Sequence, residues 1–160
     1  MNVENVNQFK AAITAFLGVL TALWGWTGWL IMAWILAMAL DYLSGTARAM
    51  KKGEWASEVA RSGLWHKAGE VISILVCLLL DVAVNVVLPN VPGLPPNLTW
   101  TFLLCPLATL WYLITEAGSI IENVAQMGAP VPKWLRKAIA ALGEKLDAEG
   151  DTLSGPKSDE

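Results

Sequence analysis

The sequence predicts an all-α protein that crosses a membrane several times. Lys and Arg are absent from two long stretches, residues 11–47 and 68–132, and the chain's 11 cations lie outside them. Only 16% of the residues are charged and 55% are hydrophobic, whereas a soluble domain carries roughly 25% charged residues. A span needs about 20 apolar residues. We therefore predict four transmembrane helices, with three as the alternative, and a C-terminal amphipathic helix.

The first stretch without cations divides into two predicted helices, residues 6–23 and 28–50. Between them lies the sequence Trp-Gly-Trp-Thr-Gly-Trp, in which glycine permits a tight turn and indole rings favour the membrane interface. We assign Trp24, Trp26 and Trp29 to that interface. In the alternative with three spans, residues 13–40 form a single tilted helix and the N-terminus lies outside.

The second stretch also divides into two predicted helices, because prolines interrupt it. A helix over residues 57–88 starts at Ser57, and the loop 89–98 holds four of the eight prolines. The next helix covers residues 99–127, with Trp100 at its outer interface. Pro106 should kink this helix because proline lacks a backbone N–H. Residues 1–128 thus form the predicted transmembrane domain.

The C-terminal segment is predicted to form an amphipathic helix over residues 129–149. Its apolar residues recur every three or four positions, with Trp134 at their edge and Lys133, Arg136 and Lys137 on the opposite side. Such a helix suits either the inner leaflet or packing against the cytoplasmic loop or a neighbouring subunit. Residues 150–160 are predicted to be a disordered polar tail.

The distribution of cations also predicts the orientation of the chain. Arg48 to Lys67 and the segment from Lys133 onward are basic, whereas the loops 24–28 and 89–98 carry no Lys or Arg. Basic loops stay in the cytoplasm. Both termini are therefore predicted to be cytoplasmic.

Polar residues form two stripes inside the predicted spans, and buried polar groups in a membrane call for a reason. Two interpretations remain open: the stripes face water in an assembled pore, or they bond to one another within one chain. The candidate residues for either role are Asp41, Ser73, Asp81, Asn85, Tyr112, Glu116, Ser119 and Asn123.

The chain lacks the sequence patterns of common enzymes. It has a single histidine, no Cys/His cluster and no glycine-rich phosphate loop, so we predict no enzymatic activity, no cofactor and no metal. No basic block exceeds two adjacent cations, and we predict no binding of nucleic acid.

Five segments, taken in order, resemble the phage holin family that includes clostridial toxin-secretion holins. They are Leu40-Asp41-Tyr42-Leu43-Ser44-Gly45, Lys51-Lys52-Gly53-Glu54, Leu78-Leu79-Leu80-Asp81, Glu116-Ala117-Gly118-Ser119-Ile120-Ile121-Glu122-Asn123 and Gly128-Ala129-Pro130-Val131-Pro132-Lys133-Trp134-Leu135. The resemblance covers roughly residues 15–145. The chain departs from the family in its proline-rich outer loop, its acidic tail and Thr115, where asparagine is frequent.

This resemblance implies a protein of the bacterial inner membrane that accumulates and then assembles into lesions. Its implied partners are the lipid bilayer, further copies of the chain, and a phage endolysin or a toxin that the lesion releases. Our leading prediction is therefore a holin that triggers host lysis. The alternatives are a small ion or solute channel or transporter that uses Asp81 and Glu116, or an antiholin partner.

Overall fold

The computed structural model describes residues 3–53, 57–92 and 103–153, and every regular element in these ranges is helical. This confirms the predicted all-α class. The elements are α1 (Val3–Lys52), α2 (Ser57–Val87), the short 3-10 helix η1 (Leu88–Asn90), α3 (Leu104–Gln126) and α4 (Lys133–Leu153).

Three helical segments within the described ranges are long and apolar enough to cross a membrane. They are Gly25–Lys52 of α1, Gly63–Asn90, which covers most of α2 and η1, and Leu104–Gln126 of α3. The chain is thus a multi-pass membrane protein. The predicted first span, residues 6–23, is helical but does not belong to this set, so the structure does not confirm a four-span arrangement.

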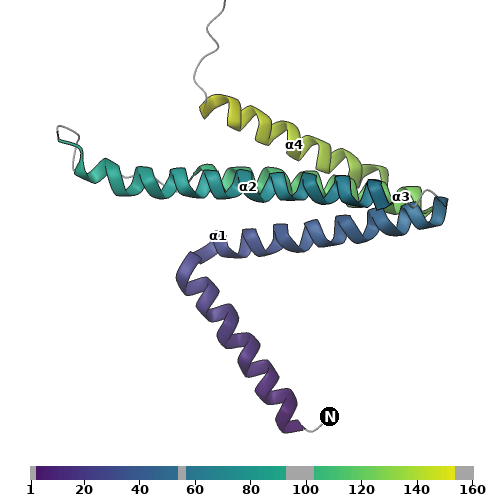
Figure 1. Cartoon of the computed structure of the whole chain (residues 1–160), viewed down its shortest axis with the longest axis horizontal. Coiled ribbons are helices and arrows are strands. Elements are labelled where there is room, and N and C mark those ends of the chain that lie inside the picture. The colour runs from purple at the N-terminus through teal and green to yellow at the C-terminus, as the bar shows by residue number, and fades with distance from the viewer. Residues whose placement is uncertain (1–2, 54–56, 93–102, 154–160) are drawn as a thin grey trace, which may run out of the picture.

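A sharp bend at Gly25 divides α1 into two arms. Gly25 has φ 55° and ψ −141°, a backbone conformation that essentially only glycine adopts. The arm before Gly25 stands away from the other helices (Figure 1). The predicted break at residues 24–28 is therefore a bend at one residue rather than a loop. Trp26 and Trp29 are exposed beside it, and the side chain of Trp24 lies outside those described.

The start of α3 differs from its prediction. Leu103 is the N-cap and α3 begins at Leu104, so Pro106 lies in the first turn, where the backbone N–H groups have no partner within the helix. Proline at this position costs little helix stability, because its missing N–H would have had no partner within the helix. Pro106 therefore marks the start of α3 and does not kink its interior. Trp100 and the rest of residues 93–102 lie outside the described residues.

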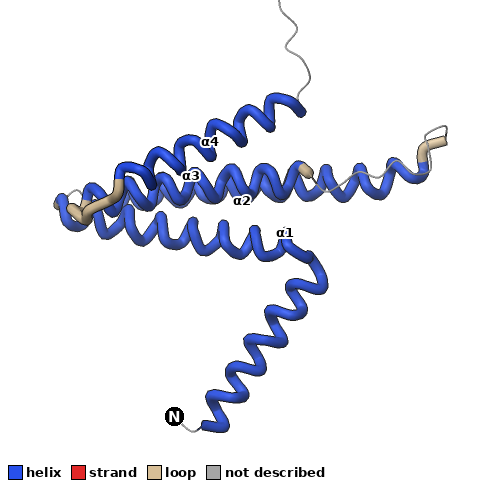
Figure 2. The backbone as a smooth tube through the Cα atoms, turned by 180° about the vertical axis from the view of Figure 1, so that it is seen from behind, coloured by secondary structure: helices blue, strands red, loops and turns tan. Residues whose placement is uncertain are grey.

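The three span-forming segments pack side by side, with α3 in contact with both α1 and α2 (Figure 2). Contacts between α1 and α2 are few. A small apolar core of Trp34, Ile74 and Cys105 joins one residue from each helix. Large apolar side chains such as Leu36, Leu43 and Leu79 remain exposed on the outside. This distribution suits a bundle surrounded by lipid or by other copies of the chain.

Helix α3 ends in a glycine motif that reverses the chain. The Gly128 and Ala129 N–H groups donate to the carbonyl oxygens of Ala125 and Val124, and Gly128 has φ 92°. Helix α4 then begins directly after Pro132 and packs against α3. The sequence predicted that this helix lies on the inner leaflet or packs against the cytoplasmic loop or a neighbouring subunit. In the structure it packs against α3 instead. The helix continues past Gly150 to Leu153, where the polar tail was predicted to have begun.

Basic side chains at the end of α1 bind the end of α3. Lys52 Nζ donates to Gln126 Oε1 at 2.8 Å, Arg48 donates to the same oxygen at 3.3 Å, and Lys51 donates to the Met127 carbonyl. Cations are favourable near a helix C-terminus, where carbonyl groups lack partners. These contacts gather the basic residues at one end of the bundle.

Candidate functional site

Lys67 of α2 lies at the centre of a polar cluster between the three span-forming segments. Its ammonium group lies 2.9 Å from Asp41 Oδ2 of α1 and also donates to Glu116 Oε1 of α3. Glu70, one turn further along α2, places Oε1 3.7 Å from the same nitrogen. One cation therefore joins carboxylates from all three helices. We call Lys67, Asp41, Glu70 and Glu116 the Lys67 cluster.

Asn123 extends the Lys67 cluster toward the basic end of the bundle. Its side-chain amide donates to Asp41 Oδ1 at 3.2 Å and contacts Ser44 Oγ at 3.1 Å. Asn123 also lies close to the backbone of α1: a β-carbon on Gly45 would be in ordinary van der Waals contact with Asn123 Nδ2, at 3.6 Å. Both oxygens of Asp41 are thus bound, one by Lys67 and one by Asn123.

The Lys67 cluster contains more negative than positive groups. Three carboxyl groups share one ammonium, and Glu70 and Glu116 are only 4% and 1% exposed. In each of these glutamates the Oε2 atom is buried and has no hydrogen-bond partner among the described residues. His66 lies 3.5 Å from Glu70 Oε1, but its side chain points outward at 78% exposure. The cluster is therefore only partly satisfied within one chain.

Asp81 forms a second, separate polar site near the opposite end of the bundle. Its carboxylate accepts the backbone N–H groups of Leu103, Leu104 and Cys105, at 3.4, 3.2 and 2.8 Å. The N-cap Leu103 has no side chain that could accept these bonds, so Asp81 of α2 caps α3 from a neighbouring helix. Asp81 is fully buried.

The remaining candidate residues lie apart from both polar sites or bond within their own helix. Ser73 donates to the Gly69 carbonyl, and Asn85 donates to the Asp81 carbonyl. Tyr112 packs on Trp34 with ring centroids 6.2 Å apart. Ser119 is half-buried on α3. The structure therefore brings together Asp41, Glu116 and Asn123 from the predicted set.

The candidate interface residues of the C-terminal helix lie at the basic end of the bundle. Lys133, Trp134, Arg136 and Lys137 are exposed in the first turns of α4. Trp134 is 69% exposed. These side chains are free of the bundle core, as an interface with lipid or water requires.

Sequence reasoning missed the central residue of the site. Lys67 was assigned to the basic, cytoplasmic segment that begins at Arg48, and Glu70 was not among the candidate residues. The signal was the spacing of Lys67 and Glu70, which places a cation and an acid on one face of a span. Ser44 also contributes, and it was noted only within the motif Leu40-Asp41-Tyr42-Leu43-Ser44-Gly45.

Within the described ranges, no group of three or more His, Cys, Asp or Glu side chains is arranged to hold a metal ion. The acidic groups of the Lys67 cluster are held by an ammonium and an amide instead. The chemistry available to the site is therefore ion pairing and hydrogen bonding between helices.

Comparison with known proteins shows the family. The model of the bacteriophage holin family matches residues 18–144, which include all three span-forming segments. The chain belongs to the bacteriophage holin family. Holins are membrane-pore proteins rather than a known class of enzyme. No solved structure gives a significant match.

Three relatives of this holin-family chain align over most of their own length. Two uncharacterized proteins of Clostridium perfringens, one of them described as a 14.9 kDa protein in the nagH 3′ region, are each 30% identical over 124 residues. These alignments cover 73% of this chain and 82% and 84% of the relatives. An uncharacterized protein of Halalkalibacterium halodurans is 28% identical over 141 residues, or 87% of this chain and 95% of its own.

Proposed function

We propose that this chain is a pore-forming holin, whose copies assemble in the bacterial inner membrane into lesions that release an endolysin or a toxin. Membership of the holin family supports the membrane lesion. The observation that carries assembly is the incomplete Lys67 cluster, in which Oε2 of Glu70 and Oε2 of Glu116, as carboxylates, have no hydrogen-bond donor among the described residues.

The unpaired oxygens of these two glutamates favour assembly energetically. A buried acceptor without a partner costs about 1–3 kcal/mol, and more if it is charged. Lipid offers no hydrogen bonds, whereas a water-filled lesion does. An assembly that exposes these carboxylates to water removes this cost. The assembled state is therefore favoured once enough copies are present. The exposed apolar side chains of α1 and α2 supply the surface on which copies would meet each other and the lipid.

The proposed orientation places the N-terminus and the basic end of the bundle in the cytoplasm. Arg48, Lys51 and Lys52 lie at the same end of the bundle as the first turn of α4, and Lys and Arg are retained on the cytoplasmic side. The arm of α1 before Gly25 is then a fourth crossing, because a segment at the outer interface would leave the N-terminus outside.

The test is inducible expression in bacteria with and without a co-expressed cytoplasmic endolysin. Abrupt lysis that requires the endolysin supports a holin. Leakage of small dyes with retention of the folded endolysin would indicate a channel for ions or solutes instead. No loss of membrane integrity from this chain alone would point to an antiholin.

The role of the Lys67 cluster is tested by Glu116→Leu. This variant removes one of the two partly unsatisfied carboxylates, so we expect later lysis or none, with the same amount of protein in the membrane. Glu122→Leu is the matched control, because Glu122 is an exposed acid on the same helix. If Glu116→Leu lyses on the wild-type schedule, the cluster does not drive assembly.

A further inference from the structure

Helix α4 runs back along α3 far beyond the turn that joins them. Ile139 Cγ2 lies 3.7 Å from the position of a β-carbon on Gly118, and Trp111 Nε1 donates to Asp147 Oδ1 at 2.6 Å. At 1.5 Å per residue, Gly118 and Trp111 are about 12 Å and 22 Å from the Gln126 end of α3. Because α3 is a span-forming segment, α4 accompanies it to membrane depth.

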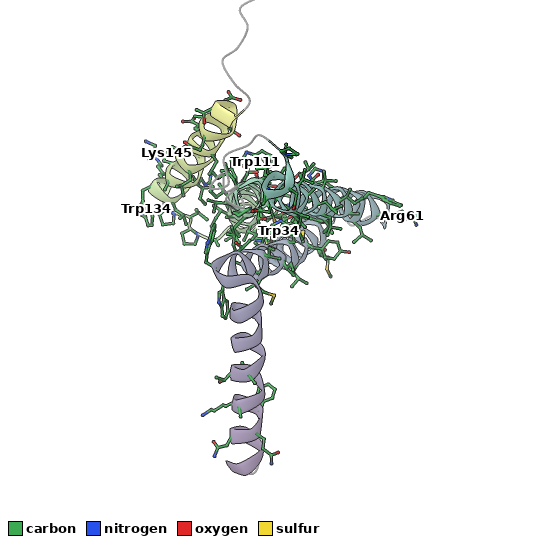
Figure 3. The ribbon with its side chains drawn as sticks, turned by 90° about the vertical axis from the view of Figure 1, so that its left-hand side faces the viewer. Trp34, Arg61, Trp111, Trp134 and Lys145 are labelled. Carbon is green, nitrogen blue, oxygen red and sulfur yellow. The ribbon has the colours of Figure 1, made fainter. Side chains whose placement is uncertain are left out.

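The charged residues of α4 are exposed at that depth. Glu144 lies between the two contacts with α3, in the sequence from Ile139 to Asp147, and its side chain is exposed, as is that of Lys145. Figure 3 shows Lys145 and Trp134 on the side of α4 that points away from the bundle. Exposed charges are unfavourable in hydrocarbon, so the positions of Glu144 and Lys145 require water, although Leu142 beside them is an apolar residue with 50% exposure.

The order of charges along α4 does not serve the helix itself. Lys133, Arg136 and Lys137 occupy its first turns, whereas Asp147, Glu149 and Asp151 follow near its end. A helix dipole favours the reverse order, with acids first and cations last. The charges are better explained by what surrounds the helix than by its own stability.

We propose that α4 lines the water-filled interior of the assembled lesion. Its charged face points into the lumen, and its Ile139 side packs on α3. The apolar exposed residues of α1 and α2, such as Leu36 and Leu79, then face lipid or neighbouring copies. Each subunit then has a charged side toward the lumen and an apolar side toward lipid or its neighbours, as a subunit of a ring-shaped pore requires. This inference rests on the proposed holin function.

The first experiment locks α4 onto α3 with Gly118→Cys/Ile139→Cys. Ile139 Cγ2 lies 3.7 Å from the position of a β-carbon on Gly118, so cysteine side chains at these two positions would face each other across the α3–α4 contact. Purified protein is reconstituted into liposomes of bacterial lipid that hold a folded enzyme, then oxidised. We expect the locked protein to release the enzyme as fully as its reduced form. Loss of release that a reductant restores would show that α4 must leave α3, and it would overturn the proposal.

The wild-type chain, oxidised in parallel, controls for its own Cys77 and Cys105. It also separates the two ideas: failure of wild type to release the enzyme counts against the holin function, whereas failure of the locked variant alone counts only against the lumen-facing α4.

The second experiment places a fluorophore on Glu144→Cys or Leu79→Cys in the same liposomes. A water-soluble quencher should reduce the Glu144→Cys signal strongly and the Leu79→Cys signal little, because Leu79 is an exposed apolar residue of a span. Equal protection of both positions would place α4 in lipid or in a dry interface, which contradicts the inference.

Discussion

The two buried polar sites of this holin-family protein bind their carboxylates in different ways. Asp81 is held by backbone N–H groups at the start of α3, which keep their positions as long as that helix exists. The carboxylates of the Lys67 cluster are held by an ammonium and a side-chain amide, whose rotamers can change while every helix stays intact.

This difference separates a structural role from a functional one. A carboxylate on backbone donors fixes where α3 begins relative to α2, and it stays fixed in any arrangement of the subunits. Side-chain pairs between three helices can be exchanged for water or for groups of another copy without unfolding. The Lys67 cluster is thus the part of the core that an assembling protein can rearrange.

The largest effect on stability is expected from Lys67→Met. This variant leaves Asp41, Glu70 and Glu116 without their shared cation, and breaking a buried ion pair from one side costs about 3–5 kcal/mol. Unfolding in detergent micelles measures it. Lys145→Met, at an exposed position of α4, is the control and should leave the midpoint unchanged. Equal midpoints for the two variants would mean that the cluster contributes nothing to the fold.

A smaller loss of stability is expected from Asp81→Leu, about 1–3 kcal/mol, because the first N–H groups of α3 lose their acceptor. Asp81→Asn keeps an acceptor oxygen and should recover much of this loss. The same unfolding measurement applies, together with lysis timing at equal membrane levels. The comparison between the two sites breaks down if Asp81→Asn alters lysis timing as strongly as Glu116→Leu.

The smallest effect is expected from Asn123→Ala, about 1 kcal/mol, because it removes hydrogen bonds but no charge. A double-mutant cycle with Asp41→Asn measures whether the two residues act together. We expect the effects to be non-additive, since Asn123 and Asp41 are in contact. Additive effects would separate Asn123 from the Lys67 cluster.

Much of the fold follows from local features of the sequence. The long stretches free of cations mark the spans, and the glycines among the tryptophans mark the bend at Gly25. Pro106 was misjudged because proline is equally consistent with a kink or with a first turn. Only the position of Leu103, which depends on capping by Asp81 from another helix, decides between them.

The polar site was harder to predict because periodicity shows which residues share a face but not what that face meets. Asp41 and Glu116 were singled out, yet their partner Lys67 was assigned to the cytoplasmic basic segment. A lysine has a long apolar stem, so its ammonium can reach a site deeper than its backbone suggests. The direction of α4 was likewise undetermined, since the prolines at 130 and 132 predict a turn but not the helix on which the chain then packs.

The bend at Gly25 turns the N-terminal arm of α1 away from the other described helices. Side chains such as Phe9 and Ile13 are exposed along it, and the arm stands clear of the bundle (Figure 1). Its angle is set by the two dihedrals of one residue and by the medium around it. We therefore expect the thickness and curvature of the host bilayer to change the angle of this arm more readily than the packing of the three spans.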